Sequence, residues 1–176
     1  GDPDAFVANA FNPDTVWIND GSGTFTNSGQ TLGDSYSNSV ALGDLDGDGD
    51  LDAFVGGTFG GIVWINDGTG NFTDSGQTLG KTSSKAVALD DLDGDGDLDV
   101  FVTYLVGEPN EVWFNDGTGN FTDSGQALGN GYSFSVALGD LDGDGDSDAV
   151  VANYYDNTWN EASTVWTNDG AGNFTT

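Results

Sequence analysis

The chain has 176 residues and a formal net charge of −28, because 30 acidic residues are balanced by 2 basic ones, and it contains no His, Cys or Met. Without Cys there is no disulfide framework, thiol nucleophile or cysteine-ligated metal site, and without His the commonest general base and metal ligand are missing. So negative a chain would repel nucleic acid and anionic membrane surfaces.

The remaining composition indicates a folded domain. A hydrophobic content of 36% is too high for a disordered acidic tail. The longest uncharged apolar stretch, residues 53–65, is broken by glycines and is shorter than the roughly 20 residues that cross a bilayer, so we expect no membrane insertion. No signal peptide is visible and the first residue is not Met, so we expect a processed, excised or engineered product.

A unit of about 48 residues recurs along the chain. The motif Asp-Leu-Asp-Gly-Asp-Gly-Asp-Leu-Asp at 44–52 returns at 91–99 and, with one Ser for Leu, at 140–148, and residues 1–7 match the end of the first copy and the strand after it, 49–55. A second block, Val-Trp-x-Asn-Asp-Gly followed by Phe, occupies 16–25, 63–72, 112–121 and 165–174. These matches divide the chain into units at about 1–35, which lacks its first strand, 36–82, 83–131 and 132–176.

Each unit predicts four short antiparallel strands. In the second unit they are 39–42, 52–55, 62–65 and a run from 72 toward 79, and the first of them recurs at 86–89 and 135–138. Asn-Asp-Gly turns join the third and fourth strands, and no segment shows a sustained helical period. We therefore expect an all-β fold, a β-propeller with three to four four-stranded blades per chain.

The repeated aromatic residues have two interpretations. Trp17, Trp64, Trp113 and Trp166, and the phenylalanines at 25, 72, 121 and 174, occupy fixed places in the units, which favours packing between blades. The alternative for the tryptophans is a platform on which a sugar stacks.

The acidic motifs predict metal sites between the first and second strands. Alternate aspartates on a tight glycine turn supply the hard oxygen ligands that Ca²⁺ prefers, whereas Zn²⁺ and copper favour nitrogen or sulfur and Mg²⁺ favours a rigid octahedron. Position 12 of each loop is Val (55, 102 and 151) rather than Glu, so the loops are not EF-hands. A solvated acidic turn is the alternative interpretation. The candidate ligands, including the partial first loop, are Asp2, Asp4, Asp44, Asp46, Asp48, Asp50, Asp52, Asp91, Asp93, Asp95, Asp97, Asp99, Asp140, Asp142, Asp144, Asp146 and Asp148.

These motifs resemble the FG-GAP/VCBS repeat family, and Val-Trp-x-Asn-Asp-Gly is similar to its bacterial VCBS version. The resemblance implies a propeller with one Ca²⁺ in each complete loop, three in this chain, together with an extracellular or cell-surface location and a role in adhesion or ligand recognition. The first unit departs from the family pattern because it retains only Asp2 and Asp4.

Differences between the units gather at one edge of the predicted blades. Antiparallel order places the acidic loops and the Asn-Asp-Gly turns at one edge and the variable connections at the other. Function in repeat proteins is often carried by such loops, although unconstrained drift gives the same pattern. The aromatic residues of this candidate ligand face are Tyr36, Tyr104, Tyr132, Phe134, Tyr154, Tyr155 and Trp159.

The function favoured by the sequence is a calcium-stabilised extracellular module for non-catalytic recognition, adhesion or assembly, with a glycan or protein ligand. The alternatives are a carbohydrate-binding lectin and a fragment of a secreted polysaccharide lyase or hydrolase. No enzyme motif has supporting context, so we expect no catalysis. Because the first unit lacks its first strand and four complete blades are therefore not reached, we also expect the chain to self-associate and close or extend the propeller.

Overall fold

The computed structural model describes residues 2–34, 36–105, 107–130, 132–154 and 162–176. These residues form fifteen strands and no helix, so the all-β prediction is confirmed. The described part of the chain accordingly holds no helix that could span a membrane. The strands group into four separate antiparallel sheets, each built from one sequence unit.

The first sheet has three strands and the other three have four. In chain order the strands of the first and second sheets are β1 (Ala5–Val7), β2 (Thr15–Asn19) and β3 (Phe25–Asn27), then β4 (Ser37–Gly43), β5 (Asp52–Gly57), β6 (Gly60–Asn66) and β7 (Phe72–Asp74). Those of the third and fourth are β8 (Ser84–Asp90), β9 (Asp99–Tyr104), β10 (Glu111–Asn115) and β11 (Phe121–Asp123), then β12 (Ser133–Gly139), β13 (Asp148–Asn153), β14 (Thr164–Asn168) and β15 (Phe174–Thr175).

Consecutive strands pair within each sheet, as the sequence predicts. The first strands are longer than expected, and the fourth are shorter: β7 ends at Asp74 rather than continuing toward Leu79. Leu79 instead forms an isolated bridge with Gly61, and the intervening residues 75–78 have no regular secondary structure. The first sheet lacks the strand that β4, β8 and β12 supply in the other sheets, as its shortened unit predicts.

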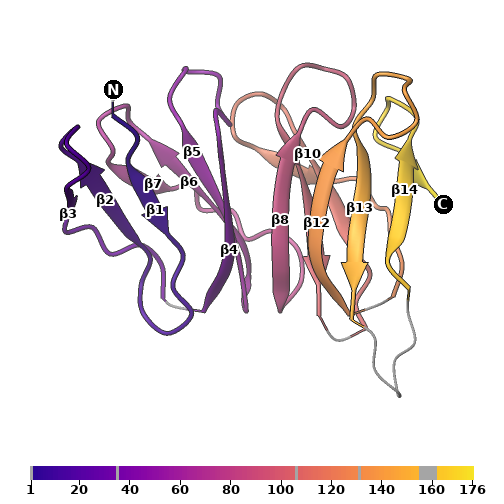
Figure 1. The fold of residues 1–176 in the computed structure, drawn as a ribbon, viewed down its shortest axis with the longest axis horizontal. Coiled ribbons are helices and arrows are strands. Elements are labelled where there is room, and N and C mark those ends of the chain that lie inside the picture. The colour runs from indigo at the N-terminus through magenta and orange to yellow at the C-terminus, as the bar shows by residue number, and fades with distance from the viewer. Residues whose placement is uncertain (1, 35, 106, 131, 155–161) are drawn as a thin grey trace.

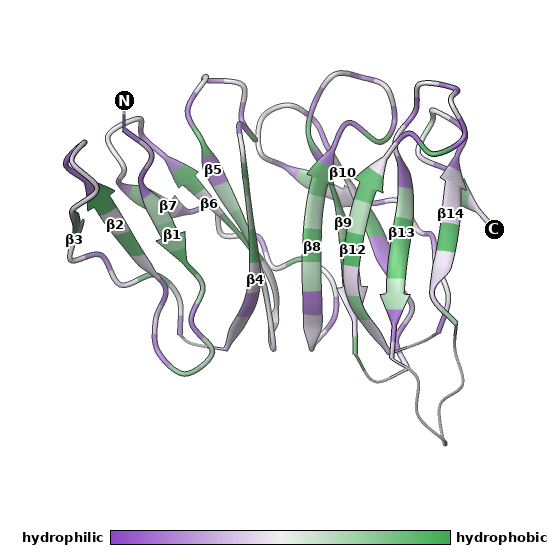
Figure 2. Ribbon diagram, in the orientation of Figure 1, coloured by the Kyte–Doolittle hydropathy of each residue, from purple (hydrophilic) through white to green (hydrophobic). Residues whose placement is uncertain are grey.

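The sheets stand side by side along a curve, with β4, β8 and β12 next to one another (Figure 1). Three hydrophobic clusters fill the spaces between neighbouring sheets, the largest around Leu45, Phe54, Val63 and Phe121. The second strands β5 and β9 are buried along their whole length because sheets cover both faces, and Figure 2 shows the hydrophobic residues along the strands. This arrangement is consistent with propeller blades, and the described sheets form an open row without ring closure.

The two edges of the sheets differ as the antiparallel order predicts. The acidic loops that follow β4, β8 and β12 lie at the upper edge in Figure 1, and the described connections that follow β5 and β9 lie at the lower edge. The upper edge therefore carries the repeated loops, and the lower edge carries the variable ones.

Candidate functional site

The first aspartate of each acidic loop shapes the turn. Asp44 accepts hydrogen bonds from the backbone N–H groups of Gly47 at 2.8 Å and Gly49 at 3.0 Å. Asp91 and Asp140 accept the corresponding pairs in their loops. Gly47 and Gly49 have φ of 78° and 93°, a backbone region that favours glycine, so the glycines allow the loop to wrap around the aspartate.

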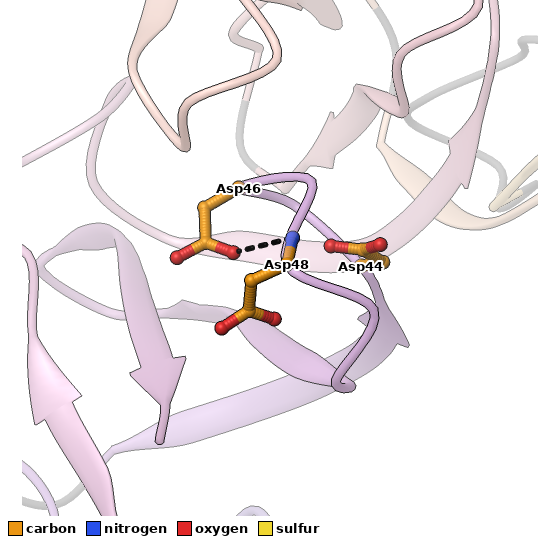
Figure 3. Close-up of side chains that lie close together, drawn as sticks. All are labelled: Asp44, Asp46 and Asp48. Atoms are coloured by element: carbon orange, nitrogen blue, oxygen red, sulfur yellow. Dashed lines mark hydrogen bonds between the residues drawn. The ribbon is translucent and has the colours of Figure 1, made fainter. Parts of the chain in front are cut away.

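Carboxylates converge in all three loops. In each loop three aspartates place one oxygen each within 4.8 Å of one another; the sets are Asp44, Asp46 and Asp48, then Asp91, Asp93 and Asp99, then Asp140, Asp142 and Asp148. Oxygens bound to one Ca²⁺ at about 2.4 Å are at most about 4.8 Å apart, so each cluster could hold a metal ion. Figure 3 shows the first set on its loop, where the Asp48 N–H donates to Asp46 at 3.3 Å.

Ionisation of the clustered carboxylates is unfavourable when no cation is bound to them. Burial and the neighbouring aspartates raise the pKa of Asp46 and of Asp93. Burial also raises the pKa of Asp99 to about 6. A divalent cation offsets both causes, because it replaces the lost hydration and neutralises the crowded charges.

The ninth aspartate of each loop has a backbone role that the sequence analysis did not predict. Asp52 is fully buried and accepts the N–H groups of Leu45 at 2.9 Å and Asn66 at 2.8 Å. Asp99 and Asp148 make the equivalent pair of hydrogen bonds. This residue ties the loop to the third strand of its sheet, and in two of the loops it also joins the carboxylate cluster.

The other predicted ligands lie outside these clusters. The aspartate at the seventh position of each loop packs against a turn glycine of its own sheet. The pairs are Asp50 and Gly68, Asp97 and Gly117, and Asp146 and Gly170, and Asp2 packs against Gly21 in the same way. Asp95 and Asp144 accept the backbone N–H of the seventh residue. Asp4 accepts the Asn19 N–H at 2.7 Å. Among the described residues Asp2 and Asp4 join no group of three carboxylates.

A cavity of about 420 Å³ opens between the first and second sheets, at the lower edge. Its lining residues include Asp14, Asp74, Tyr36, Phe59 and Trp64. Burial raises the pKa of Asp14, which accepts hydrogen bonds from the Asn9 N–H and the Ser37 hydroxyl. The cavity thus combines aromatic surface with hydrogen-bonding groups.

The buried indole N–H of Trp64 has no hydrogen-bond acceptor in the structure. In the equivalent places Trp17 donates to the Thr15 hydroxyl at 3.1 Å and Trp113 donates to Glu111 at 3.3 Å, whereas the buried Trp166 N–H also has no acceptor. The second unit has Ile62 where those acceptors stand, and a buried donor without an acceptor is costly. Trp64 therefore lines the cavity and carries an unused donor that is itself buried.

Two exposed aromatic residues, Tyr36 and Phe59, line this cavity. Tyr36 makes edge contacts with Phe11 and Phe59, at centroid distances of 6.4 and 5.8 Å. All three rings are exposed, and Tyr36 has a φ of 79°, which is strained for a residue with a side chain. The predicted candidate Tyr36 is thus joined by two rings that the sequence analysis did not select.

A second aromatic pair lies on the same lower edge. Phe134 and Tyr154 are exposed, with centroids 5.5 Å apart, and the Lys85 Nζ lies 5.7 Å from the Phe134 centroid. Tyr132 is half-buried. Tyr155 and Trp159 lie outside the described residues.

The prediction that Tyr104 belongs to an exposed ligand face is wrong. Tyr104 is fully buried, donates to Glu111 at 2.8 Å and accepts the Lys81 N–H at 3.1 Å. Lys81 also pairs with Glu111 at 3.1 Å. Tyr104 occupies the place that Gly57 has in the second unit, so its ring fills the crevice between the second and third sheets, whereas the preceding crevice stays open.

The phenylalanine series also departs in part from its predicted packing role. Phe121 and Phe174 are buried between sheets, but Phe25 is 46% exposed. The reason is its position, because no described sheet precedes β1–β3.

The FG-GAP-like repeat model matches residues 1–55, 56–102 and 91–151. The chain belongs to the FG-GAP-like repeat family. These matches cover all three acidic loops and most of the chain, as the resemblance stated from the motifs implies. No curated protein matches the sequence.

A solved structure is similar in fold. It is a lectin from Agrocybe aegerita that recognises non-reducing terminal N-acetylglucosamine, and it matches with a TM-score of 0.58 and 25% identity over 98% of this chain. The match covers 47% of the lectin, so this chain spans about half the length of that protein.

Proposed function

We propose that the protein is a calcium-stabilised, non-catalytic recognition module that binds a glycan in the cavity between the first two sheets. The observation that carries the proposal is a cavity that is lined by Trp64, Tyr36 and Phe59, in which the Trp64 indole N–H is a buried donor without an acceptor. Sugars suit such a site, because their C–H faces pack on aromatic rings and their oxygen atoms form hydrogen bonds with the polar groups of the site.

The neighbouring lectin supports this choice of ligand class. Its recognition of N-acetylglucosamine makes that sugar the first probe, and the acetamido carbonyl of such a sugar is a suitable acceptor for the Trp64 N–H. Recognition of a protein ligand in an adhesion role remains the other outcome of a binding screen.

Calcium has a structural part in the proposal. One Ca²⁺ in each complete acidic loop, three in all, is held by the clustered aspartates and neutralises their charge, while the ninth aspartate fixes the loop to the sheet. The proposal includes an extracellular location, where Ca²⁺ is abundant. The lyase or hydrolase alternative is tested by assaying the protein for release of uronic acids or reducing sugars.

A substitution of Trp64 tests the glycan site. Trp64→Phe keeps the ring but removes the N–H, so the affinity for an N-acetylglucosamine glycan should fall by about tenfold, as expected when a buried hydrogen bond to the ligand is lost. Trp17→Phe is the matched control, because the Trp17 N–H already donates to Thr15.

Isothermal titration calorimetry on the intact protein measures both variants, and a glycan array identifies the preferred sugar. Unchanged affinity in Trp64→Phe, or no glycan binding by the unmodified protein, contradicts the proposal.

A further inference from the structure

Three acidic residues line the cavity between the first and second sheets, and none of the described residues that line it is basic. Asp14 directly precedes β2, Asp34 lies in the connection that leads to β4, and Asp74 ends β7. Asp14 is almost fully buried, whereas Asp34 and Asp74 are exposed. Burial raises the pKa of Asp14, so a cation in the cavity would stabilise its ionised form.

The chain does not supply that cation. Its two basic residues are Lys81 and Lys85. Lys81 pairs with Glu108 at 3.4 Å and with Glu111 at 3.1 Å, and the Lys85 Nζ lies over the Phe134 ring. Within the part of the chain that the structure describes, the three carboxylates of the cavity therefore form no ion pair.

The crevice between the second and third sheets shows an ammonium group at the equivalent place. Lys81 occupies the position in its connection that Asp34 occupies in the connection before it. The Lys81 ammonium contacts Glu111, and the Tyr104 hydroxyl donates to the same carboxylate. This crevice thus contains a cation from the chain itself, whereas the open cavity has a carboxylate at the corresponding position.

Aromatic residues provide the rest of the cavity's character. Its lining includes Tyr36, Phe59 and Trp64, and the first two rings are in edge contact at 5.8 Å. Aromatic faces attract ammonium groups and also pack against the C–H faces of sugars. The indole N–H of Trp64, which is buried and has no acceptor, is an independent sign of a missing polar partner. A suitable ligand therefore combines a positive charge, an apolar face and a hydrogen-bond acceptor.

We propose that the glycan bound in this cavity carries a free, protonated amino group, so that the ligand class is a partly deacetylated oligosaccharide of N-acetylglucosamine. This inference rests on the glycan-binding function proposed above. The ammonium group lies among the three carboxylates, and the sugar rings pack against the aromatic residues. A hydroxyl or acetamido oxygen of the oligosaccharide accepts the Trp64 N–H.

The test has to separate the cavity from the charge of the whole molecule, because a net charge of −28 attracts any cation. Binding is therefore measured in 150 mM NaCl, which screens charges beyond about 8 Å, with millimolar CaCl₂ to supply the acidic loops. The probes are a fully acetylated and a half-deacetylated tetramer of N-acetylglucosamine. Tetralysine is the cationic probe without a sugar.

Titration calorimetry on the intact protein compares these probes. The half-deacetylated tetramer should bind at least about tenfold more tightly than the acetylated one, because it adds charge-assisted hydrogen bonds to carboxylates. Equal affinities overturn the inference and leave the proposed glycan-binding function in place, whereas no binding of either tetramer overturns both. Tetralysine that binds as tightly as the half-deacetylated tetramer overturns the assignment of a sugar.

A matched pair of variants tests where the ammonium group binds. Asp74 is paired in register with Trp64, and Asp123 is paired in the same way with Trp113. Both aspartates are exposed and accept the backbone N–H two residues later, for which Asn keeps an oxygen. Asp74→Asn should weaken binding of the half-deacetylated tetramer by about fivefold. Asp123→Asn, near the filled crevice of Tyr104, should leave it unchanged, and equal effects would exclude the cavity.

A charge reversal at Asp34 gives a second, independent measurement. Asp34→Lys places an ammonium group where Lys81 has one, so the preference for the half-deacetylated over the acetylated tetramer should disappear. Asp123→Lys changes the net charge by the same amount and should keep the preference. Asp34 and Asp123 are exposed, and circular dichroism checks that both variants fold. A preference that persists in Asp34→Lys overturns the inference.

Discussion

At the residue scale, the buried ninth aspartate of each loop combines two tasks. Asp52 accepts two backbone N–H groups from opposite sides, one from the loop and one from β6. Its position in the sequence suggested metal ligation alone, because a carboxylate at the end of an acidic motif gives no sign of which backbone groups will face it. The structure shows that the loop is fixed to the sheet through this side chain.

Replacing Asp52 with Asn should lower the stability of the protein. The amide keeps the shape but turns one acceptor into a donor, which then faces a buried backbone N–H, so we expect a loss of about 2–3 kcal/mol. Urea unfolding monitored by tryptophan fluorescence measures it. Asp4→Asn is the matched control, since Asp4 is exposed and accepts a single N–H, and its cost should be below about 1 kcal/mol. Equal costs for the two variants would contradict this role.

At the element scale, the repeat predicted the order of the strands and the placement of repeated and variable loops at opposite edges of each sheet. Alternating apolar residues and Asn-Asp-Gly turns recur at fixed spacing, which is what made this possible. The inter-sheet contacts were not predictable. Gln77 is half-buried and lies in an irregular segment after a short strand. Its hydrogen-bond partners lie more than forty residues away in the sequence, so the local sequence pattern could not predict this role. The exposure of Phe25 and the burial of Tyr104 likewise depend on which sheet is next to them.

Replacing Gln77 with Leu tests a contact between the second and third sheets, in which the Gln77 side chain donates to the Gly119 carbonyl at 2.7 Å and accepts the Phe121 N–H at 2.9 Å. The change leaves the Gly119 carbonyl and the Phe121 N–H without their partner, so the free energy of unfolding should fall by about 2 kcal/mol. Gln77→Glu keeps the acceptor but not the donor and should give an intermediate loss. A Leu variant as stable as the unmodified protein would show that water replaces both hydrogen bonds.

At the scale of the whole molecule, the acidic loops link stability to calcium and to pH. Metal bound to the native state at a hundredfold excess over its dissociation constant contributes about 2.7 kcal/mol per site, so removing Ca²⁺ from three sites should lower the melting temperature by on the order of 20 °C at pH 7. Calorimetry of protein dialysed free of metal, compared with protein in millimolar CaCl₂, measures the change. An unchanged midpoint removes calcium from the proposed function.

The same pair of samples should show opposite pH dependences. The folded pKa of Asp99, about 6, lies above the ordinary value of 3.8, so without metal its contribution to stability is present below pH 3.8 and is lost as pH rises through 6. Metal-free protein should therefore melt higher at pH 5 than at pH 7. Calcium requires ionised carboxylates, so the calcium-loaded protein should melt lower at pH 5. A metal-free protein that loses stability on acidification would contradict the assignment.

One exchange between otherwise similar units, Gly57 in the second against Tyr104 in the third, separates an open crevice from a filled one. In an array of near-identical units, a small residue at this strand end leaves the crevice of the proposed glycan site open, and a large ring fills it, so the exchange sets the number of such sites. Because avidity rises with the number of sites engaged at the same time, substitution at this one position would change the strength of the proposed multivalent binding while the scaffold stays the same.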